Sequence, residues 1–340
     1  MSIKNRLFDY LPVSIKIEIF KKKYFNNPCG FGESFSESLN KAFDVFLSPR
    51  EKADKKNVEY LTNDIIKCWI LYKALPYEYF SLGLRYSDKK KRASYMTDIE
   101  TINMCKKYSN LDEFLNVISD KYAFYERMNP FFRRRVFHVD IHSDKEQFLA
   151  FVIEVKHLFC KLNKGSRGVG AFSAEISNET DAFKLYEKLT TNPEEDWIVE
   201  EKIVQSQEMA QWNTSCVNTV RLPAILTNSR IKVLDPFLRT GRAGADVDNA
   251  GQGGVFAGID PDTGMIITDG VDELGHSFVS HPDSGMVFKG WQVPHWDELL
   301  ETAKKAHLNM PDQKYIGWDF ALTDKGWVLI EGNWGQLVGH

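Results

Sequence analysis

The segments Gly317-Trp318-Asp319-Phe320-Ala321 and Val328-Leu329-Ile330-Glu331-Gly332-Asn333 stand close together near the C-terminus. Each contains an apolar run of the length of a β-strand. Between them lies Thr323-Asp324-Lys325-Gly326, a polar turn that ends in glycine. We therefore predict a β-hairpin whose strands cover Ile316–Leu322 and Trp327–Ile330.

This hairpin would bring two carboxylates and an amide together. Side chains alternate along a strand, so Glu331 and Asn333 point to the same face, and Asp319 on the facing strand can lie beside them. Oxygen ligands of this kind suit Mg²⁺. The alternative is a polar strand edge without a metal, and the pattern by itself leaves both interpretations open.

A second chemical signal is a lysine at a predicted strand end, before a loop rich in glycine. The stretch Phe159–Gly170 reads FCKLNKGSRGVG, with Lys161 ahead of the glycines. Glycine lets backbone N–H groups approach phosphates, and lysine neutralises their charge. The loop lacks GxxxxGK[ST], so it is not a Walker A motif. Lys121 follows Asp120 on a predicted helix. The alternatives are a plain surface turn and a solvated lysine.

Composition and charge divide the chain into two parts. The 340 residues are 43% apolar and 26% charged, which excludes a disordered or fibrous protein. Residues 1–135 carry 25 Lys and Arg against 17 Asp and Glu, whereas residues 136–340 carry 18 against 30. The two parts therefore have different roles. The net charge of −4 argues against a nucleic-acid partner.

The spacing of apolar residues changes near residue 135. Residues 34 to about 125 have helical spacing, and Asn110 with Glu113 forms a capping-box pattern for a helix that begins at Leu111. Further on, short apolar runs such as Phe151–Phe159 alternate with turns, and Trp296–Leu308 is predicted to be helical. We also predict strands over Trp197–Val199, Val217–Leu226, Ile231–Leu238, Val255–Ile259 and Met265–Ile267.

The cysteines and the N-terminus bear on localisation. The five cysteines are odd in number and contain no CxxC, which favours a reducing compartment, so we expect a cytoplasmic protein. No segment has the ~20 uncharged apolar residues that span a bilayer. Residues 1–25 mix isoleucines with Lys21–Lys23. They form either an interfacial helix peripheral to the inner membrane face or, as the commoner case, a helix packed on its own protein.

Together these features resemble the ATP-grasp superfamily, and specifically its sugar-transfer-associated group. The resemblance covers about residues 111–340. It rests on Val217-Asn218-Thr219-Val220-Arg221, on Val247-Asp248-Asn249 with Gly253-Gly254, and on Trp318-Asp319 with Glu331-Gly332-Asn333. It implies an α+β ATP-grasp fold in which two α+β subdomains clasp ATP. The implied parts are a helical extension over 1–110, a first subdomain over 111–197 and a second over 198–340.

The resemblance also implies contacts to the nucleotide. Lys121 and Lys161 would contact the ATP phosphates, and a flap would close over them through Gly165, Ser166, Gly168 and Gly170. Glu201 would meet the adenine amino group and the backbone of Val204 the ring edge. Glu208, seven residues after Glu201, would bind the ribose hydroxyls. Three features depart from the family pattern: Lys161-Leu162 replaces Lys-Pro, the loop keeps three glycines and adds Lys164 and Arg167, and the sequence ends seven residues after Asn333.

The implied metal set is Asp319 with Glu331 for one Mg²⁺ and Glu331 with Asn333 for a second. Arg221, then Arg239, would stabilise the transferring phosphoryl group together with Lys161. Because arginine binds carboxylates through a two-pronged fork, Arg239 and Arg242 are also candidates for a substrate carboxylate; solvated arginines on a mobile surface loop are the alternative. Asp248 and Asn249 either orient an amine or sugar hydroxyls or form turns.

The implied activity is that of an ATP-dependent carboxylate–amine ligase, which forms an amide through an acyl phosphate. The group points to a sugar carboxylate such as a uronic acid, joined to an amino acid or another amine in capsule or exopolysaccharide biosynthesis. Small carboxylates and amines would then be the partners, and a homo-oligomer is compatible with the sequence. The alternatives are an ATP-dependent phosphotransferase acting on a sugar or hydroxyl acceptor and a non-catalytic ATP-binding module.

Overall fold

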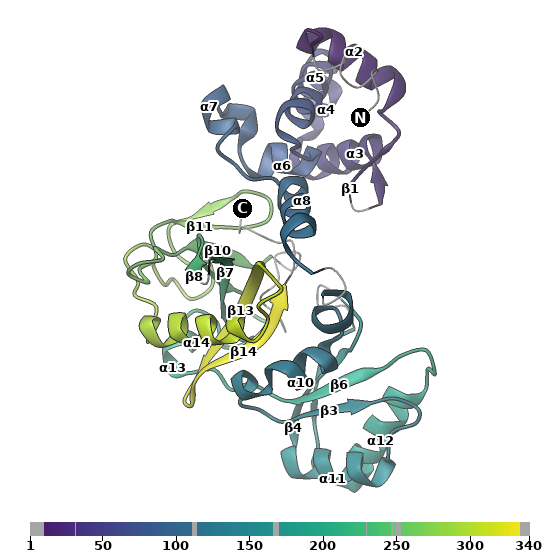
Figure 1. The fold of residues 1–340 in the computed structure, drawn as a ribbon, viewed down its shortest axis with the longest axis vertical. Helices are drawn as coiled ribbons and strands as arrows, with labels where there is room; N and C mark the ends of the chain where they lie inside the picture. The colour runs from purple at the N-terminus through teal and green to yellow at the C-terminus, as the bar shows by residue number, and fades with distance from the viewer. Residues whose placement is uncertain are drawn as a thin grey trace. The chain divides into compact units, whose positions relative to one another are not determined.

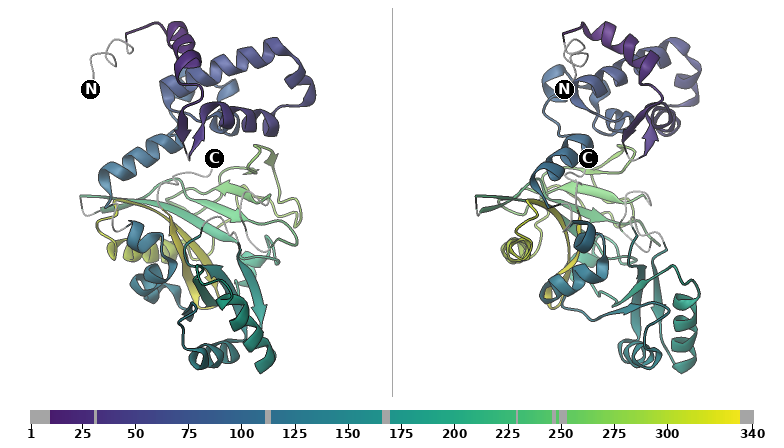
Figure 2. Two further views of the ribbon diagram at one scale, coloured as in Figure 1. Left: turned by 90° about the vertical axis from the view of Figure 1, so that its right-hand side faces the viewer. Right: turned by 45° about the vertical axis from the view of Figure 1, so that its right-hand side comes forward.

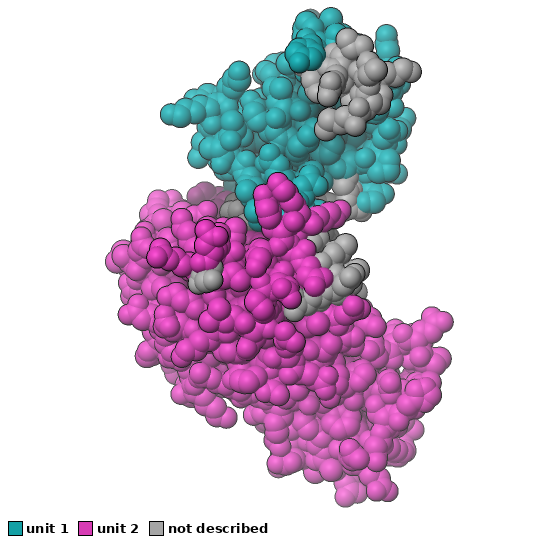
Figure 3. Space-filling view, viewed as in Figure 1, with its two compact units in different colours: residues 1–104, 274–276, 340 teal, residues 105–273, 277–339 magenta. Residues whose placement is uncertain are grey.

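The computed structural model describes residues 10–30, 32–110, 114–165, 170–228, 230–245, 248 and 253–333. The chain divides into two compact units (Figure 3). The first consists of Met1–Met104 with Leu274–His276 and His340, and the second of Cys105–Glu273 with Ser277–Gly339. The start of the helix predicted at Leu111 lies outside the described residues.

The first unit is mainly helical, and capping side chains define where its helices begin. Ser34 and Ser48 each cap a helix in a capping box with the glutamate three residues on, and Asp54 caps the longest helix. The elements are α2 (Val13–Lys23), β1 (Pro28–Gly30), β2 (Glu33–Ser34), α3 (Phe35–Phe46), α4 (Pro49–Ala53), α5 (Lys55–Tyr72), α6 (Pro76–Ser81), η1 (Leu84–Tyr86), α7 (Lys89–Arg92) and α8 (Asp98–Tyr108), the last of which runs across the division.

The second unit contains a small antiparallel sheet with strand order β3-β6-β4-β5. Its two helices, α11 and α12, lie on one face of the sheet and share an apolar core with it (Figures 1 and 2). The apolar run Phe151–Phe159 is divided between α11 and β4. The elements are β3 (Val136–Val139), α11 (Lys145–Val155), β4 (His157–Leu162), β5 (Phe172–Glu175), α12 (Glu179–Thr190) and β6 (Trp197–Glu201).

A larger antiparallel sheet follows, with order β12-β11-β10-β9-β7-β13-β14, and β8 pairs with β7. Figure 2 shows the β13–β14 hairpin in yellow beside α14. The elements are η2 (Phe114–Ile118), α10 (Lys121–Phe132), α13 (Gln207–Ala210), β7 (Thr219–Thr227), β8 (Arg230–Val233), β9 (Phe237–Thr240), β10 (Val255–Gly258), β11 (Gly270–Val271), β12 (Ser277–Phe278), α14 (Trp296–Leu308), β13 (Tyr315–Thr323) and β14 (Gly326–Asn333).

The C-terminal hairpin and the helix Trp296–Leu308 are confirmed. The single strand predicted over Ile231–Leu238 is wrong, because the chain turns between β8 and β9. Asp235 there has a φ of +24°, outside the extended region, and Pro236 has no N–H to donate to a ladder. The strand predicted over Met265–Ile267 is reduced to isolated bridges, from Met265 to Gln292 and from Ile266 to Ile259.

One face of the hairpin is apolar and carries helices. Trp318 lies opposite Leu222 and Gly332 across the neighbouring strands. The ring of Phe124, on α10, is so close to Gly332 that a Cβ there would lie 3.0 Å from it. Glycine at this position therefore lets α10 pack directly on β14.

The described part of the chain contains no helix that is long and apolar enough to cross a membrane. All five cysteines are buried, and none of them forms a disulfide.

His307, on α14, is fully buried against the hairpin. The indole N–H of Trp318 donates to its Nδ1 at 3.4 Å, so the ring proton sits on Nε2, which donates to the carbonyl oxygen of Gln313 at 2.8 Å. Burial lowers the pKa of His307 to about 4.

This pKa predicts an acid-sensitive core. Between pH 6.5 and 4 the unfolded chain binds a proton at His307 that the folded chain does not, so the free energy of unfolding should fall as the pH falls, by up to about 3 kcal/mol from this group. Urea unfolding of the wild type and of His307→Leu at pH 7 and pH 4.5 measures it. The variant should be less stable at pH 7 but lose less on acidification. The exposed His142→Leu is the control, and an equal acid loss in His307→Leu would contradict the prediction.

Candidate functional site

The polar face of the hairpin carries a row of charged side chains. Arg221 on β7, Asp319 on β13 and Glu331 on β14 lie directly opposite one another in register. Directly paired residues of antiparallel strands project to the same face, so the three side chains form one row across the sheet. Asp319 is 2% exposed and Arg221 is 7% exposed. We call Arg221, Asp319 and Glu331 the charged row.

Hydrogen bonds link the row to two further residues. Arg221 donates to both carboxylate oxygens of Asp319, from Nε to Oδ1 at 2.5 Å and from Nη2 to Oδ2. Arg239 Nη1 donates to Asp319 Oδ2 at 3.1 Å. Asn333 Nδ2 donates to Asp319 Oδ2 and to Glu331 Oε1, both at 3.2 Å. The structure thus brings together five residues that were predicted from sequence.

The charges of these groups stabilise one another. Burial alone would raise the pKa of Asp319, but the positive charges of Arg221 and Arg239 outweigh it and hold this pKa below its ordinary value. Burial would likewise lower the pKa of Arg221, and the negative charge of Asp319 raises it above the ordinary value instead. The pair is therefore fully ionised, as a buried ion pair must be.

Asp248 is in contact with Arg239 and is 8% exposed. It accepts a hydrogen bond from the hydroxyl of Thr219, and its Oδ1 is 3.3 Å from Arg239 Nη2. Burial raises the pKa of Asp248, although Arg239 opposes the shift. Asp248 therefore touches Arg239, a second candidate for substrate binding. Asn249 lies outside the described residues, and the substrate roles of both stay predictions.

The charged row, together with Asn333, contains oxygen atoms of the kind that bind magnesium. No three His, Cys, Asp or Glu side chains gather into a metal-binding group within the described ranges, so a site here needs the amide of Asn333. A half-turn of that amide would place its oxygen where Nδ2 now approaches both carboxylates, giving the all-oxygen set that Mg²⁺ prefers. Asp319 Oδ2 already accepts hydrogen bonds from Arg221, Arg239 and Asn333, so a metal ion would have to displace one of them.

Lys161 projects from β4 toward a carboxylate that the sequence analysis missed. Its Nζ is 2.8 Å from Glu200 Oε1, and the Glu200 side chain is 4% exposed. Glu200 lies opposite Phe159, so it shares a face with Lys161, two residues further along β4. Burial would raise the pKa of Glu200, but Arg134 and Lys161 outweigh it and lower this pKa to about 2.

The neighbouring Glu201, predicted to meet adenine, lies on the other side of the strand. Its Oε2 accepts a hydrogen bond from the backbone N–H of Arg135 at 3.3 Å, and the side chain is 37% exposed. Val204 is 76% exposed. The structure does not bring Glu201 together with Lys161, whereas Glu200 is in contact with it. The adenine contacts stay predictions.

Lys121 donates hydrogen bonds to the backbone at the start of the glycine loop. Its Nζ donates to the carbonyl oxygens of Leu162, Asn163 and Gly165 at 2.8, 3.1 and 2.6 Å. Burial, followed by the positive charge of Lys161, lowers the pKa of Lys121. Its three donors are thus directed to backbone oxygens, and a phosphate would have to replace one of them. Ser166 and Gly168 lie outside the described residues, and Gly170 has a φ of +77°.

Asn163 is a second residue that the sequence analysis missed. It is 2% exposed, and its Oδ1 accepts the backbone N–H of Tyr122 at 2.8 Å. Its Nδ2 donates to Asp196 at 2.7 Å. Asn163 therefore fastens the first turn of α10, which carries Lys121, to the end of β4. An asparagine in a glycine loop gave no signal for this role beyond its position directly after the strand.

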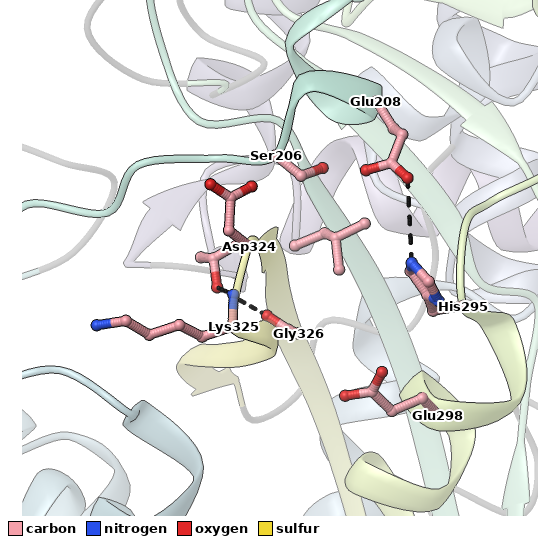
Figure 4. Close-up of a pocket in the computed structure, with 9 residues that line it drawn as sticks. Ser206, Glu208, His295, Glu298, Asp324, Lys325 and Gly326 are labelled. Atoms are coloured by element: carbon pink, nitrogen blue, oxygen red, sulfur yellow. Dashed lines mark hydrogen bonds and ion pairs between the residues drawn. The ribbon is translucent and has the colours of Figure 1, made fainter.

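Glu208, predicted to bind ribose, lines a pocket of about 420 Å³ at the turn of the hairpin (Figure 4). His295 lies 4.0 Å from it across the pocket. No residue of the charged row lines this pocket, so the pocket does not bring Glu208 together with the predicted metal ligands. The remaining lining residues are Ser206, Glu298, Leu322, Thr323, Asp324, Lys325 and Gly326.

Arg242 forms its two-pronged fork with a carboxylate of the protein. Its Nε and Nη2 donate to the two oxygens of Asp283 at 2.7 and 2.9 Å, and the backbone N–H of Ala243 donates to Asp283 as well. The hydrogen bonds from Arg242 lower the pKa of Asp283 to about 2. A substrate carboxylate at Arg242 would have to displace Asp283.

Comparisons with known proteins identify the family of this chain. A family model described as sugar-transfer associated ATP-grasp matches residues 106–340. Among solved structures, D-alanyl-alanine synthetase A from Vibrio cholerae O1 biovar eltor str. N16961 is 12% identical with a TM-score of 0.42, covering 67% of this chain and 59% of its own. The ATP-grasp ligase PsnB complexed with minimal precursor is 13% identical with a TM-score of 0.40, covering 87% and 68%.

No curated protein matches the sequence. The chain spans less than two thirds of the length of the Vibrio synthetase. The predicted α+β ATP-grasp fold with helices ahead of it is confirmed, because the family model begins at residue 106, within α8, and helices α2 to α7 precede it. Since this model covers well over half of the 340 residues, the chain belongs to the sugar-transfer associated ATP-grasp family.

Proposed function

We propose that this protein is an ATP-dependent carboxylate–amine ligase that forms an amide through an acyl phosphate. The observation that carries the proposal is the charged row with Asn333 beside it, because it combines oxygen ligands for a metal with a fixed guanidinium. Lys121 lies within reach of the charges of both Glu331 and Glu200, which supports a single site for the lysines and the row. Membership of the ATP-grasp family, whose members bind ATP and magnesium, supports the choice of nucleotide.

Asp319, Glu331 and Asn333 are the residues that would hold magnesium. Bound magnesium neutralises charge on the phosphates and on the transferring phosphoryl group. Lys161 would bind a phosphate after leaving Glu200, and Lys121 would exchange one of its three backbone oxygens for a phosphate oxygen. Glu201, Val204 and Glu208 remain the proposed contacts to adenine and ribose, with Gly165, Ser166, Gly168 and Gly170 as the proposed flap.

Arg221 and Arg239 would stabilise the reacting phosphoryl group. A carboxylate oxygen of the substrate attacks the γ-phosphorus while the bond from phosphorus to the bridging oxygen breaks, and ADP leaves. The amine nitrogen then attacks the acyl carbon, the carbon–oxygen bond to phosphate breaks, and the nitrogen loses a proton. Positioning and electrostatics supply the catalysis, so no side-chain nucleophile is needed. The five buried cysteines accord with that.

For the substrates we propose a sugar carboxylate, such as a uronic acid, and an amino acid or another amine. The support is the description of the family as sugar-transfer associated. Arg239 and Arg242 would receive the carboxylate, with Asp248 and Asn249 orienting the amine or the sugar hydroxyls. Capsule or exopolysaccharide biosynthesis in the cytoplasm is the setting that we propose.

One prediction of the proposed function concerns nucleotide binding. Mg-ATP at about 100 times its Kd should stabilise the wild type by about 3 kcal/mol, because ligand bound to the folded state shifts the unfolding equilibrium. Glu331→Gln should lose most of this gain, since it removes the carboxylate that both metal ions share. Thermal unfolding with and without Mg-ATP measures the effect. Glu301→Gln, an exposed carboxylate on α14 paired with Lys304, is the matched control. Equal stabilisation of wild type and Glu331→Gln would contradict the assigned metal site.

Another prediction of the proposed function concerns the reaction. With Mg-ATP, hydroxylamine and a panel of uronic acids, the protein should release ADP only when a carboxylate is present, and an acyl hydroxamate should accumulate, because hydroxylamine intercepts an acyl phosphate. Coupled ADP assays and mass spectrometry measure both products. A stable phosphorylated sugar without hydroxamate would identify a phosphotransferase instead. Mg-ATP binding with no turnover across carboxylates and sugars would identify a binding module.

A further inference from the structure

A buried chain of polar contacts runs from the small sheet to the hairpin, with Arg134 at its centre. Arg134 Nε donates to Glu200 Oε2 at 2.9 Å, and Nη2 lies 2.7 Å from the same oxygen. Nη1 donates to the carbonyl oxygens of Leu329 at 2.6 Å and of Phe132 at 3.3 Å. The side chains of Arg134 and Glu200 are each 4% exposed, so water does not compete for these contacts.

The two ends of this chain of contacts are functional candidates. At one end, Glu200 lies 2.8 Å from the ammonium of Lys161. At the other end, the carbonyl of Leu329 belongs to β14, two residues before Glu331. The contact to Leu329 is made to the main chain, so it fixes the strand itself. The guanidinium also lies over the ring of Phe132, 4.4 Å from its centre, which restricts its orientation.

We propose that Arg134 is a positioning residue that aligns the phosphate-binding lysine of the small sheet with the metal-binding strand of the large sheet. The proposal rests on the proposed function, in which Lys161 meets phosphate and Glu331 meets magnesium. A nucleotide can satisfy both only when β4 and β14 are correctly placed. Arg134 fixes that placement through Glu200 on one side and the backbone of Leu329 on the other.

The same contacts allow Lys161 to move. When its ammonium turns from Glu200 to a phosphate, Glu200 keeps both contacts to Arg134 and is not left as an unpaired buried charge, which would be costly. A planar guanidinium can serve a carboxylate and two carbonyl groups at once, whereas a lysine ammonium is a compact point charge. Arg134→Lys therefore keeps the charge beside Glu200 and removes the link to Leu329.

The test measures how strongly magnesium tightens nucleotide binding. Dissociation constants of a non-hydrolysable ATP analogue are determined calorimetrically in magnesium and in EDTA. In the wild type, magnesium should tighten binding. In Arg134→Lys, affinity in EDTA should stay within about threefold, while the gain from magnesium should fall about tenfold, the size of an ordinary coupling between two sites. A role in stability alone would lower the melting temperature and leave this ratio unchanged, which would overturn the proposal.

Arg133→Lys is the matched control. Arg133 is the adjacent residue, and its Nη1 also donates to a carbonyl of the same hairpin, that of Lys325, at 2.7 Å. Its Nη1 lies 3.8 Å from Oε1 of Glu298, whereas the carboxylate partner of Lys161 is Glu200. Arg133 is therefore not linked to Lys161 through a shared carboxylate. Its substitution should leave the magnesium ratio unchanged. An equal loss in Arg133→Lys would overturn the assignment of the link to Arg134. A wild type that binds no nucleotide in either buffer would instead overturn the proposed function, and this inference with it.

A second measurement covers the case in which Arg134→Lys does not fold. Hydrogen exchange of the wild type is followed with and without the analogue in EDTA. Because Arg134 joins Glu200 to Leu329, nucleotide bound at Lys161 without magnesium should still slow exchange in residues 328–331 of β14. Unchanged exchange in these residues, with protection confined to the small sheet, would overturn the proposal.

Discussion

The buried ion pair between Arg221 and Asp319 is the interaction on which the rest of the structure depends. A carboxylate in the middle of a sheet costs several kcal/mol in lost hydration, and β13 can carry one only because Arg221 on β7 and Arg239 on β9 face it. The pair also fixes the register of these strands. A shift of one residue would turn Asp319 to the face that holds Trp318, against the helices, and take its carboxylate away from both arginines.

The hairpin thus has two faces with different tasks, and packing on the apolar face supports the chemistry on the polar one. Phe124 sits on Gly332, between Glu331 and Asn333, so α10 lies directly on the strand that carries two predicted metal ligands. The same helix begins with Lys121, which is fastened to the glycine loop through three backbone oxygens. A Cβ at position 332 would lie 3.0 Å from the ring of Phe124, so a larger residue there would require this ring to shift. This close contact gives a physical reason for glycine between the two predicted ligands.

The sequence predicts the features that follow from local pattern and misses those that depend on register. The hairpin and α14 are confirmed because turn residues and helical spacing are local signals. Glu200 and Glu201 cannot be distinguished in the sequence, and only the pairing of β6 with β4 shows that Glu200 faces Lys161. Arg134 is equally hidden in a run of three arginines that has the composition of a solvated surface, although it is the buried member of the run. The metal and nucleotide roles of the predicted residues rest on the family pattern and on their convergence.

The cations of the site already have protein partners, and this changes what ligand binding costs. Lys161 is paired with Glu200, Arg221 with Asp319 and Arg242 with Asp283. An incoming phosphate or carboxylate therefore exchanges one ion pair for another and does not remove a free cation from water. The exchange at Arg221 differs from that at Lys161, because Glu200 keeps Arg134 whereas Asp319 would keep only Arg239. A magnesium ion held by Asp319 would supply the missing positive charge and leave Arg221 available for an anion. It follows that metal and nucleotide should each favour the binding of the other at this row.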